Sequence, residues 1–189
     1  LDDTAGRVPP SALRAGLPTV AGVKLLGWPG AGEDPPRTAV APGVAGAAID
    51  AAARDGDVVI VDVPRWACFG ESDHGSFAME ALTRSSRVIL VASADVRSAL
   101  AGKRLLAQDP LRGLPVGLVV RGPSPGGITA SDVAGALEVP LLAFVPAERG
   151  LDRLLEDGFP PGSRRGSPLR ACARTLLAGL AEARSGGGG

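Results

Sequence analysis

The chain has 189 residues, of which 45% are apolar and 21% are charged, and its 20 basic side chains balance its 20 acidic ones. This length and apolar content are sufficient for one domain with a hydrophobic core, and they exclude a disordered tail. Because the net charge is zero, we predict no specific nucleic-acid partner. No run approaches the roughly 18 to 20 consecutive apolar residues that span a bilayer, so we expect a cytoplasmic protein.

Few side chains are available for acid–base or metal chemistry. The sequence has one histidine, His74, no tyrosine, and two cysteines, Cys68 and Cys172. Two distant cysteines without paired histidines cannot form a structural zinc site. We therefore expect both cysteines to be buried apolar residues.

The first third of the chain predicts little regular structure. Residues 1–22 are rich in proline and small residues and allow one short helix at Ser11–Ala15. Val23–Trp28 predicts a first strand, and alanine-rich Val44–Arg54 predicts a helix that Gly56 ends. The apolar stripe expected on this helix consists of Val44, Ala48 and Ile49.

Four short, unbroken apolar runs are typical of parallel strands that are buried on both faces. They are Val58–Val61, Val88–Ala92, Val116–Val120 and Leu141–Val145.

Helices are predicted between and after these runs. Ser93 or Asp95 can cap a helix over Val96–Ala107, and Thr129 with Asp132 forms a capping box at the start of another. The residues expected to face inward on the first helix are Val96, Ala99, Leu100 and Ala107. Ile128 is expected to contact Val133 as a hydrophobic staple of the second.

Two more helices follow the last apolar run. Pro146 suits the first position of a helix that ends at Gly158, and Pro168–Ala183 predicts a terminal helix with a leucine stripe. This alternation predicts an α/β fold, a mostly parallel sheet with helices on both faces. We expect a single, partial domain over residues 1–185, with an irregular segment at 1–22, and a flexible glycine tail at 186–189.

Asp62 is the strongest candidate for a functional residue. It ends the apolar run at Val58–Val61, and ligands of parallel α/β sheets bind beyond the carboxyl ends of strands. A carboxylate there can hold a magnesium-bound water near a nucleotide phosphate. An aspartate that caps the next turn has the same pattern, so both interpretations stay open.

The sequence lacks a phosphate-binding loop, and its one match to a serine-hydrolase motif does not fit that function. No G-x-x-x-x-G-K-[ST] phosphate loop occurs in the sequence. Residues 122–126 match G-x-S-x-G, but Pro125 follows Ser124 and has no backbone N–H for an oxyanion hole. His74, the sole histidine, also precedes Ser124, whereas it comes last in hydrolases of that class.

His74 and the arginines near the terminal helix have simpler interpretations. His74 lacks companion residues, so we expect a loop or helix-start residue rather than a catalyst. The arginines could bind an acidic membrane surface, but packing of this helix on the sheet is the favoured interpretation. They are Arg164, Arg165, Arg170, Arg174 and Arg184.

The order of these segments resembles the MinD/ParA family of deviant P-loop ATPases. Within it the chain is most similar to actinobacterial CpaE-like or septum-site-determining proteins, relatives of the CpaE/TadZ factors of Flp (Tad) pilus assembly. DVVIVDVPRW at Asp57–Trp66 is similar to the Walker B and switch II segment of the family. Arg87–Leu106 is similar to its next strand and helix, and Val116–Pro161 to its nucleotide-base end. The last stretch, with its V-P-x-E turn, is the most specific.

The resemblance implies roles for individual residues. Asp62 matches the switch II aspartate near magnesium and the attacking water, so it is the implied catalytic and metal residue. Pro146 matches the proline that packs against adenine. Arg121 stands where many relatives have an asparagine that reads the base, and Arg65 replaces the small residue or proline usual in the switch.

The phosphate loop, its lysine and the switch I aspartate of the family would all precede Leu1. The sequence starts without methionine, and its one methionine is Met79, so we expect a piece of a longer protein. Without the phosphate-loop strand, Val58–Val61 would lack a neighbour in the sheet. ATP and magnesium are the cofactors that the family implies, and we expect this chain alone neither to bind nor to hydrolyse ATP.

The resemblance implies a spatial regulator of pilus assembly, secretion or septum placement. It would act by nucleotide-linked dimerisation and recruitment of protein partners, in the cytoplasm or at the inner face of the cell membrane, with at most weak membrane contact. The alternative is a non-enzymatic scaffold of the same fold whose nucleotide site has decayed. A relative that activates a carboxylate with ATP and a DNA-partitioning protein are further alternatives, and the zero net charge weakens the latter.

Overall fold

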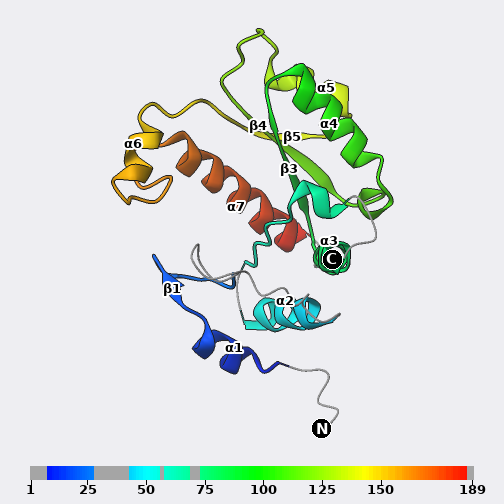
Figure 1. Ribbon diagram of the computed structural model, residues 1–189, viewed down its shortest axis with the longest axis vertical. Coiled ribbons are helices and arrows are strands. Elements are labelled where there is room, and N and C mark those ends of the chain that lie inside the picture. Colours follow the sequence, from blue (N-terminus) through cyan, green and yellow to red (C-terminus); the bar gives the residue numbers. More distant parts are fainter. Residues whose placement is uncertain (1–7, 28–42, 56–57, 69–72, 187–189) are drawn as a thin grey trace. The chain divides into compact units, whose positions relative to one another are not determined.

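The computed structural model describes residues 8–27, 43–55, 58–68 and 73–186 of the chain (Figure 1). The chain forms two compact units, residues 1–86 and residues 87–189.

The first unit contains short elements. Helix α1 spans Pro10–Gly16, and a hairpin of two-residue strands follows, β1 at Thr19–Val20 and β2 at Val23–Lys24. The helix predicted at Ser11–Ala15 is therefore confirmed. The strand predicted at Val23–Trp28 is wrong beyond Lys24, because β2 pairs only with the two residues of β1. Trp28 lies outside the described residues.

The rest of the first unit is helical. It consists of α2 at Val44–Asp55, a short 3₁₀ helix η1 at Arg65–Cys68, and α3 at Asp73–Thr83. The helix predicted at Val44–Arg54 is confirmed, but Val44 is exposed rather than part of a buried stripe. The buried side of α2 instead carries Gly46 and Ala51. Gly56, its expected end, lies outside the described residues.

Glu80 of α3 holds the start of α2. Its carboxylate accepts hydrogen bonds from the backbone N–H groups of Gly43 and Gly46, at 2.7 and 2.6 Å. Arg84, one turn later, pairs with Asp50 at 3.2 Å. A Cβ on Gly46 would lie 2.6 Å from the guanidinium carbon of Arg84 and 2.8 Å from the Glu80 carboxylate, so a larger residue there would displace these side-chain ends. A carboxylate at a helix N-terminus satisfies donors that the helix itself leaves unpaired.

The strand predicted at Val58–Val61 is wrong. Residues 58–64 contain neither helix nor strand, and Ile60 is 85% exposed. A strand exists only where a neighbouring strand accepts and donates its ladder bonds. Among the described residues, none pairs with this run, so its apolar composition alone does not make it a strand.

The second unit is an α/β layer structure around three parallel strands. Strand β3 at Val88–Ser93 pairs with β4 at Val116–Arg121, and β4 pairs with β5 at Leu141–Val145. The sheet order is β3-β4-β5. All three predicted strands are confirmed. The prediction of an α/β fold with a parallel sheet and helices on both faces is confirmed for this unit.

Helices cover both faces of this sheet (Figure 1). Helices α4 at Val96–Leu106 and α5 at Ala130–Leu137 lie on one side and α7 at Pro168–Gly186 lies on the other. The core on the α4 and α5 side contains the fully buried Leu118, Val120 and Val133. On the α7 side, Val119 and Val145 pack with Cys172. Central strand β4 is therefore buried from both sides.

Several details of the predicted helices need correction. Val96 and Leu100 of α4 are 59% and 55% exposed, and Gly102 and Leu105 face the core instead. Gly102 permits this, because a Cβ there would meet Leu137 of α5 at 3.2 Å. Leu177 of α7 is also exposed.

The helix predicted to start at Pro146 begins later. Helix α6 spans Leu151–Glu156, and its N-cap, Gly150, has a left-handed backbone with φ +73°. Residues 146–148 lie in an irregular segment after β5. The left-handed φ at Gly150 interrupts the backbone, so the helix cannot extend back to Pro146. Helix α7 includes Gly186, which the sequence places in the tail, and residues 187–189 lie outside the described residues.

We predict that Val120→Ala lowers the free energy of unfolding by about 2–3 kcal/mol, because it removes two buried methyl groups and leaves a cavity. Val91→Ala is the matched control, since Val91 lies in the same sheet but is 62% exposed. Urea denaturation followed by circular dichroism measures both. Equal losses in the two variants would contradict the central position of β4.

We predict that Glu80→Ala lowers the stability of the first unit by about 1–3 kcal/mol, since it leaves the N–H groups of Gly43, just before α2, and of Gly46 in its first turn without their charged acceptor. Both tryptophans, Trp28 and Trp66, belong to residues 1–86, so tryptophan fluorescence during urea denaturation follows this unit. Glu156→Ala, an exposed carboxylate of the other unit, is the control and should leave the fluorescence transition unchanged.

Candidate functional site

The carboxyl ends of the three parallel strands lie at one edge of the sheet. The register pairs Ser93 at the end of β3 with Arg121 of β4, and Arg121 with Val145 of β5. Ligands of parallel α/β sheets bind beyond this edge. We call the segments that follow the three strands here the carboxyl edge: residues 93–95, 121–124 and 144–148.

At the end of β3, Asp95 caps α4. The backbone N–H of Ser98 donates to its carboxylate at 2.8 Å, and the Ser98 hydroxyl donates at 3.0 Å. These two bonds hold the pKa of Asp95 below its ordinary value. The prediction that Ser93 or Asp95 caps this helix is thus resolved in favour of Asp95.

The end of β4 touches the turn after β5. The N–H of Gly122 donates to the carbonyl of Val145 at 2.8 Å. A Cβ on Gly122 would lie 3.2 Å from Cζ of Phe144 and 3.6 Å from Cα of Pro146. Gly122 therefore leaves the space in which β4 and this turn approach each other closely.

The loop between β4 and α5 is fixed by its own side chains. The hydroxyl of Ser124 donates to the carbonyl of Ile128. Because this bond uses the hydroxyl proton, Ser124 has a structural role in the loop, as expected for a residue that is not a nucleophile. Thr129 and Asp132 form the predicted capping box, with the Asp132 N–H donating to Thr129 at 3.1 Å. The Thr129 hydroxyl and N–H hold the pKa of Asp132 below its ordinary value.

The turn after β5 is attached to the start of α7. The hydroxyl of buried Ser167 donates to the Glu148 carboxylate at 2.7 Å. Arg164 donates to the carbonyl of Arg149 at 3.4 Å. The sequence shows Glu148 in the V-P-x-E turn but does not show its partner, because Ser167 is 19 residues away.

The structure brings together two of the three candidate site residues. Arg121 and Pro146 both lie at the carboxyl edge and are exposed. The register puts the Arg121 side chain on the α7 side of the sheet, with Val145. Asp62 is exposed in the irregular segment 58–64 of the other unit.

The remaining chemically interesting residues have structural positions. His74 lies in the first turn of α3, as the sequence predicts. Cys68 and Cys172 are free and buried, as predicted, and burial raises the pKa of both thiols. Among the residues that the structure describes, no group of three histidines, cysteines or carboxylates could hold a metal ion. Over the same residues, no helix has the length and apolar character needed to cross a membrane.

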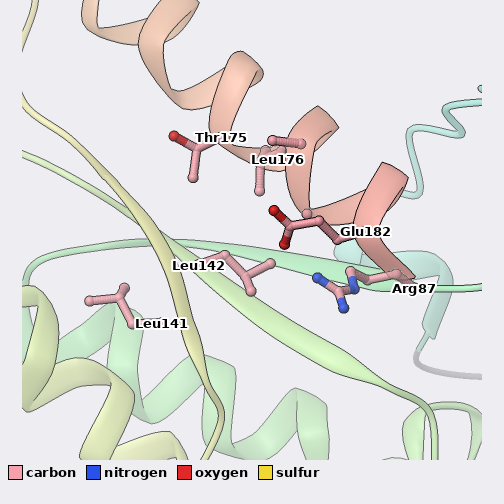
Figure 2. A pocket seen from close by; sticks show the side chains of 8 residues that line it. Arg87, Leu141, Leu142, Thr175, Leu176 and Glu182 are labelled. Carbon is pink, nitrogen blue, oxygen red and sulfur yellow. The ribbon is translucent and has the colours of Figure 1, made fainter. Parts of the chain in front are cut away.

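A groove of about 450 Å³ lies on the α7 side of the second unit, at the amino end of β5 (Figure 2). Leu142 of β5 and Leu176 of α7 form its apolar part, and Arg87 and Glu182 lie at one end. The lining comes from Arg87 before β3, from the first two residues of β5 and from α7, so the groove is separate from the carboxyl edge. No local sequence pattern predicts this groove, because its lining residues are far apart in the chain.

Comparison with known proteins finds two relatives, both from Mycobacterium tuberculosis and named uncharacterized protein MT3760 and uncharacterized protein Rv3660c. Each is 37% identical to the chain over 181 residues, which is 96% of the chain and 48% of the relative. The chain thus spans about half the length of these relatives. No family model matches the chain, and no solved structure matches it.

We predict a pH-dependent effect of Asp95→Ala. A lowered pKa in the folded state means that the ionised cap stabilises the fold above the ordinary pKa of 3.8, and that this contribution is lost as the pH falls through the lower, folded value. Thermal unfolding should show a lower Tm for the variant at pH 7 and a shrinking difference below pH 3.8. A difference that stays constant with pH would contradict the charged cap.

Proposed function

We propose that the chain is the C-terminal portion of a MinD/ParA-like ATPase that resembles CpaE and septum-site-determining proteins. In this proposal it regulates the place of pilus assembly, secretion or septum formation, through nucleotide-linked dimerisation and recruitment of protein partners. The whole protein would act in the cytoplasm or at the inner face of the cell membrane.

The close approach of Gly122 and Pro146 carries the proposal. It joins the end of β4 to the V-P-x-E turn at the carboxyl edge, where ligands of parallel α/β sheets bind. Those two segments are the ones whose sequences resemble the nucleotide-base end of the family. Their contact supports a shared site for the base.

The open edge of β3 gives independent support. Strand β3 pairs with β4 on one side, and no other described strand pairs with it. An edge strand presents unpaired backbone N–H and C=O groups, which are an aggregation risk in an apolar strand such as β3, so a further strand is expected beside it. The side chains of Ile89 and Val91, which face away from the α4 and α5 core, are also 37% and 62% exposed. A nucleotide-binding strand, which the resemblance implies and the sequence lacks, would cover this edge and provide the phosphate loop.

Three residues have assigned roles in this proposal. Asp62 would hold the magnesium-bound water, Pro146 would pack against the base, and Arg121 would occupy the position of the asparagine that reads the base in many relatives. The exposed positions of all three are compatible with ligand contact. ATP and magnesium would require a phosphate-binding backbone in addition to these residues, because the sequence contains no phosphate loop.

A non-enzymatic scaffold of the same fold is the second candidate. Arg121 and Arg65 favour it, since both depart from the residues that the family uses in base recognition and in the switch. In that case the protein would recruit partners without a nucleotide-dependent change, because a ligand can shift an equilibrium only by its differential affinity for two states.

A chimera separates these functions. In this chimera, the 181 matched residues of this chain replace the corresponding residues of the M. tuberculosis relative. The rest of the relative, about half of its length, is kept. We predict that the chimera dimerises with Mg-ATP but not with Mg-ADP in analytical ultracentrifugation, and that Asp62→Asn lowers its ATP hydrolysis at least about tenfold.

The 189-residue chain alone is the control, and we expect no magnesium-dependent ATP binding from it. Asp152→Asn, an exposed aspartate on α6, should leave hydrolysis by the chimera unchanged. The same association state with and without nucleotide would contradict the switch and favour the scaffold.

A further inference from the structure

The groove between β5 and α7 has an apolar part and a charged end. Leu142 and Leu176 form the apolar part, and Leu141 extends it on the side away from Arg87 (Figure 2). Its volume of about 450 Å³ lies within the roughly 300–1,000 Å³ that is typical of small-molecule sites. The groove is therefore large enough for one small ligand with an apolar portion.

Arg87 provides a positive charge at one end of the groove. Its side chain is half-buried, and a Cβ on Gly179 of α7 would lie 3.9 Å from its Nη1. Because Gly179 has no side chain, the guanidinium beside it stays accessible from the groove. In the part of the chain that the structure describes, Arg87 has no hydrogen-bonding or ion-pair partner. A partly buried charge of this kind gains from an anionic partner.

Glu182 provides the opposite charge at the same end. It lies near the end of α7, and in Figure 2 its carboxylate and the Arg87 guanidinium both point into the groove. No ion pair joins the two side chains, and Glu182 has no other partner among the described residues. Two opposite charges that line one groove without pairing can each bind a different group of a ligand that carries both charges.

We propose that this groove binds a free α-amino acid with an apolar side chain. The Arg87 guanidinium donates hydrogen bonds to the α-carboxylate, and the Glu182 carboxylate accepts them from the α-ammonium group. The side chain of the ligand packs between Leu142 and Leu176, which removes its apolar surface from water. The groove is separate from the carboxyl edge, so this proposal does not depend on the nucleotide site.

L-Leucine is the probe, and NMR titration of the 189-residue chain measures its binding. Leucine should shift the amide signals of Leu142, Leu176 and Gly179. Three analogues each lack one recognised group: glycine lacks the apolar side chain, N-acetylleucine lacks the ammonium group, and leucinamide lacks the carboxylate. We expect each analogue to bind at least about tenfold more weakly than leucine, because each leaves one part of the site without its partner.

Arg87→Gln and Glu182→Gln should each weaken leucine binding at least about tenfold. Neither side chain has a partner in the described residues, so both variants should keep the fold. Arg104→Gln is the matched control, since Arg104 is an exposed arginine of α4 on the other face of the sheet. It should leave leucine binding unchanged.

Gly179→Leu tests the groove without removing a charge. Apart from Nη1 of Arg87 at 3.9 Å, nothing lies within 4 Å of a Cβ at this position, so the new side chain can enter the groove. Leucine also favours a helix more than glycine does, so α7 should not lose stability. We expect this variant to lose leucine binding while its amide spectrum overlays that of the parent chain away from the groove.

The proposal is wrong if leucine causes no shifts at the groove, or if any of the three analogues binds as tightly as leucine. Binding that survives in Arg87→Gln, Glu182→Gln or Gly179→Leu would also contradict it. None of these outcomes depends on ATP or on the chimera, so the proposed nucleotide switch and the amino-acid site are tested separately.

Discussion

Burial of β4 on both faces is the constraint on which the second unit depends. Leu118 and Val120 are fully buried on one side, and Val119 is buried on the other. A strand of this kind needs a parallel neighbour on each edge and helices above and below, which β3, β5, α4, α5 and α7 provide. Gly117 adds a tight contact, because a Cβ there would overlap the side chain of Leu142.

The position of β4 also determines the candidate site. Parallel strands on both sides bring the carboxyl ends of β3 and β5 level with Arg121. The following residue, Gly122, then lies against the turn at Pro146. Hydrogen bonds fix the surrounding segments. Asp95 caps α4, and Thr129 with Asp132 caps α5. Glu148 accepts a hydrogen bond from Ser167 at the start of α7. Phe144 and Pro146 are therefore exposed at an edge whose neighbouring segments are fixed by hydrogen bonds.

The sequence predicts this second unit well because its signals are local. Apolar runs, the capping box and the start of α7 at Pro168 depend on residues within a few positions of each other, and all three are confirmed.

Contacts between residues far apart in the chain cannot be predicted from such local signals. Glu80 accepts a hydrogen bond from Gly43, 37 residues away. In α4, Leu100 is exposed and Gly102 is buried, the reverse of what their polarity alone predicts. Val58–Val61 shows the same limit, since an apolar run becomes a strand only beside a partner. The single domain over residues 1–185 and the roles of Asp62, Arg121 and Pro146 stay predictions.

The central claim is that the carboxyl edge is the base end of a nucleotide site. Photocrosslinking of the chimera with 8-azido-ATP, followed by mapping of the labelled peptides by mass spectrometry, tests this claim most directly. The account predicts labelling within residues 121–124 or 144–148 that an excess of unlabelled ATP suppresses. Labelling at other segments of the second unit, such as the groove at Arg87 and Glu182, or labelling that ATP does not suppress, would contradict it.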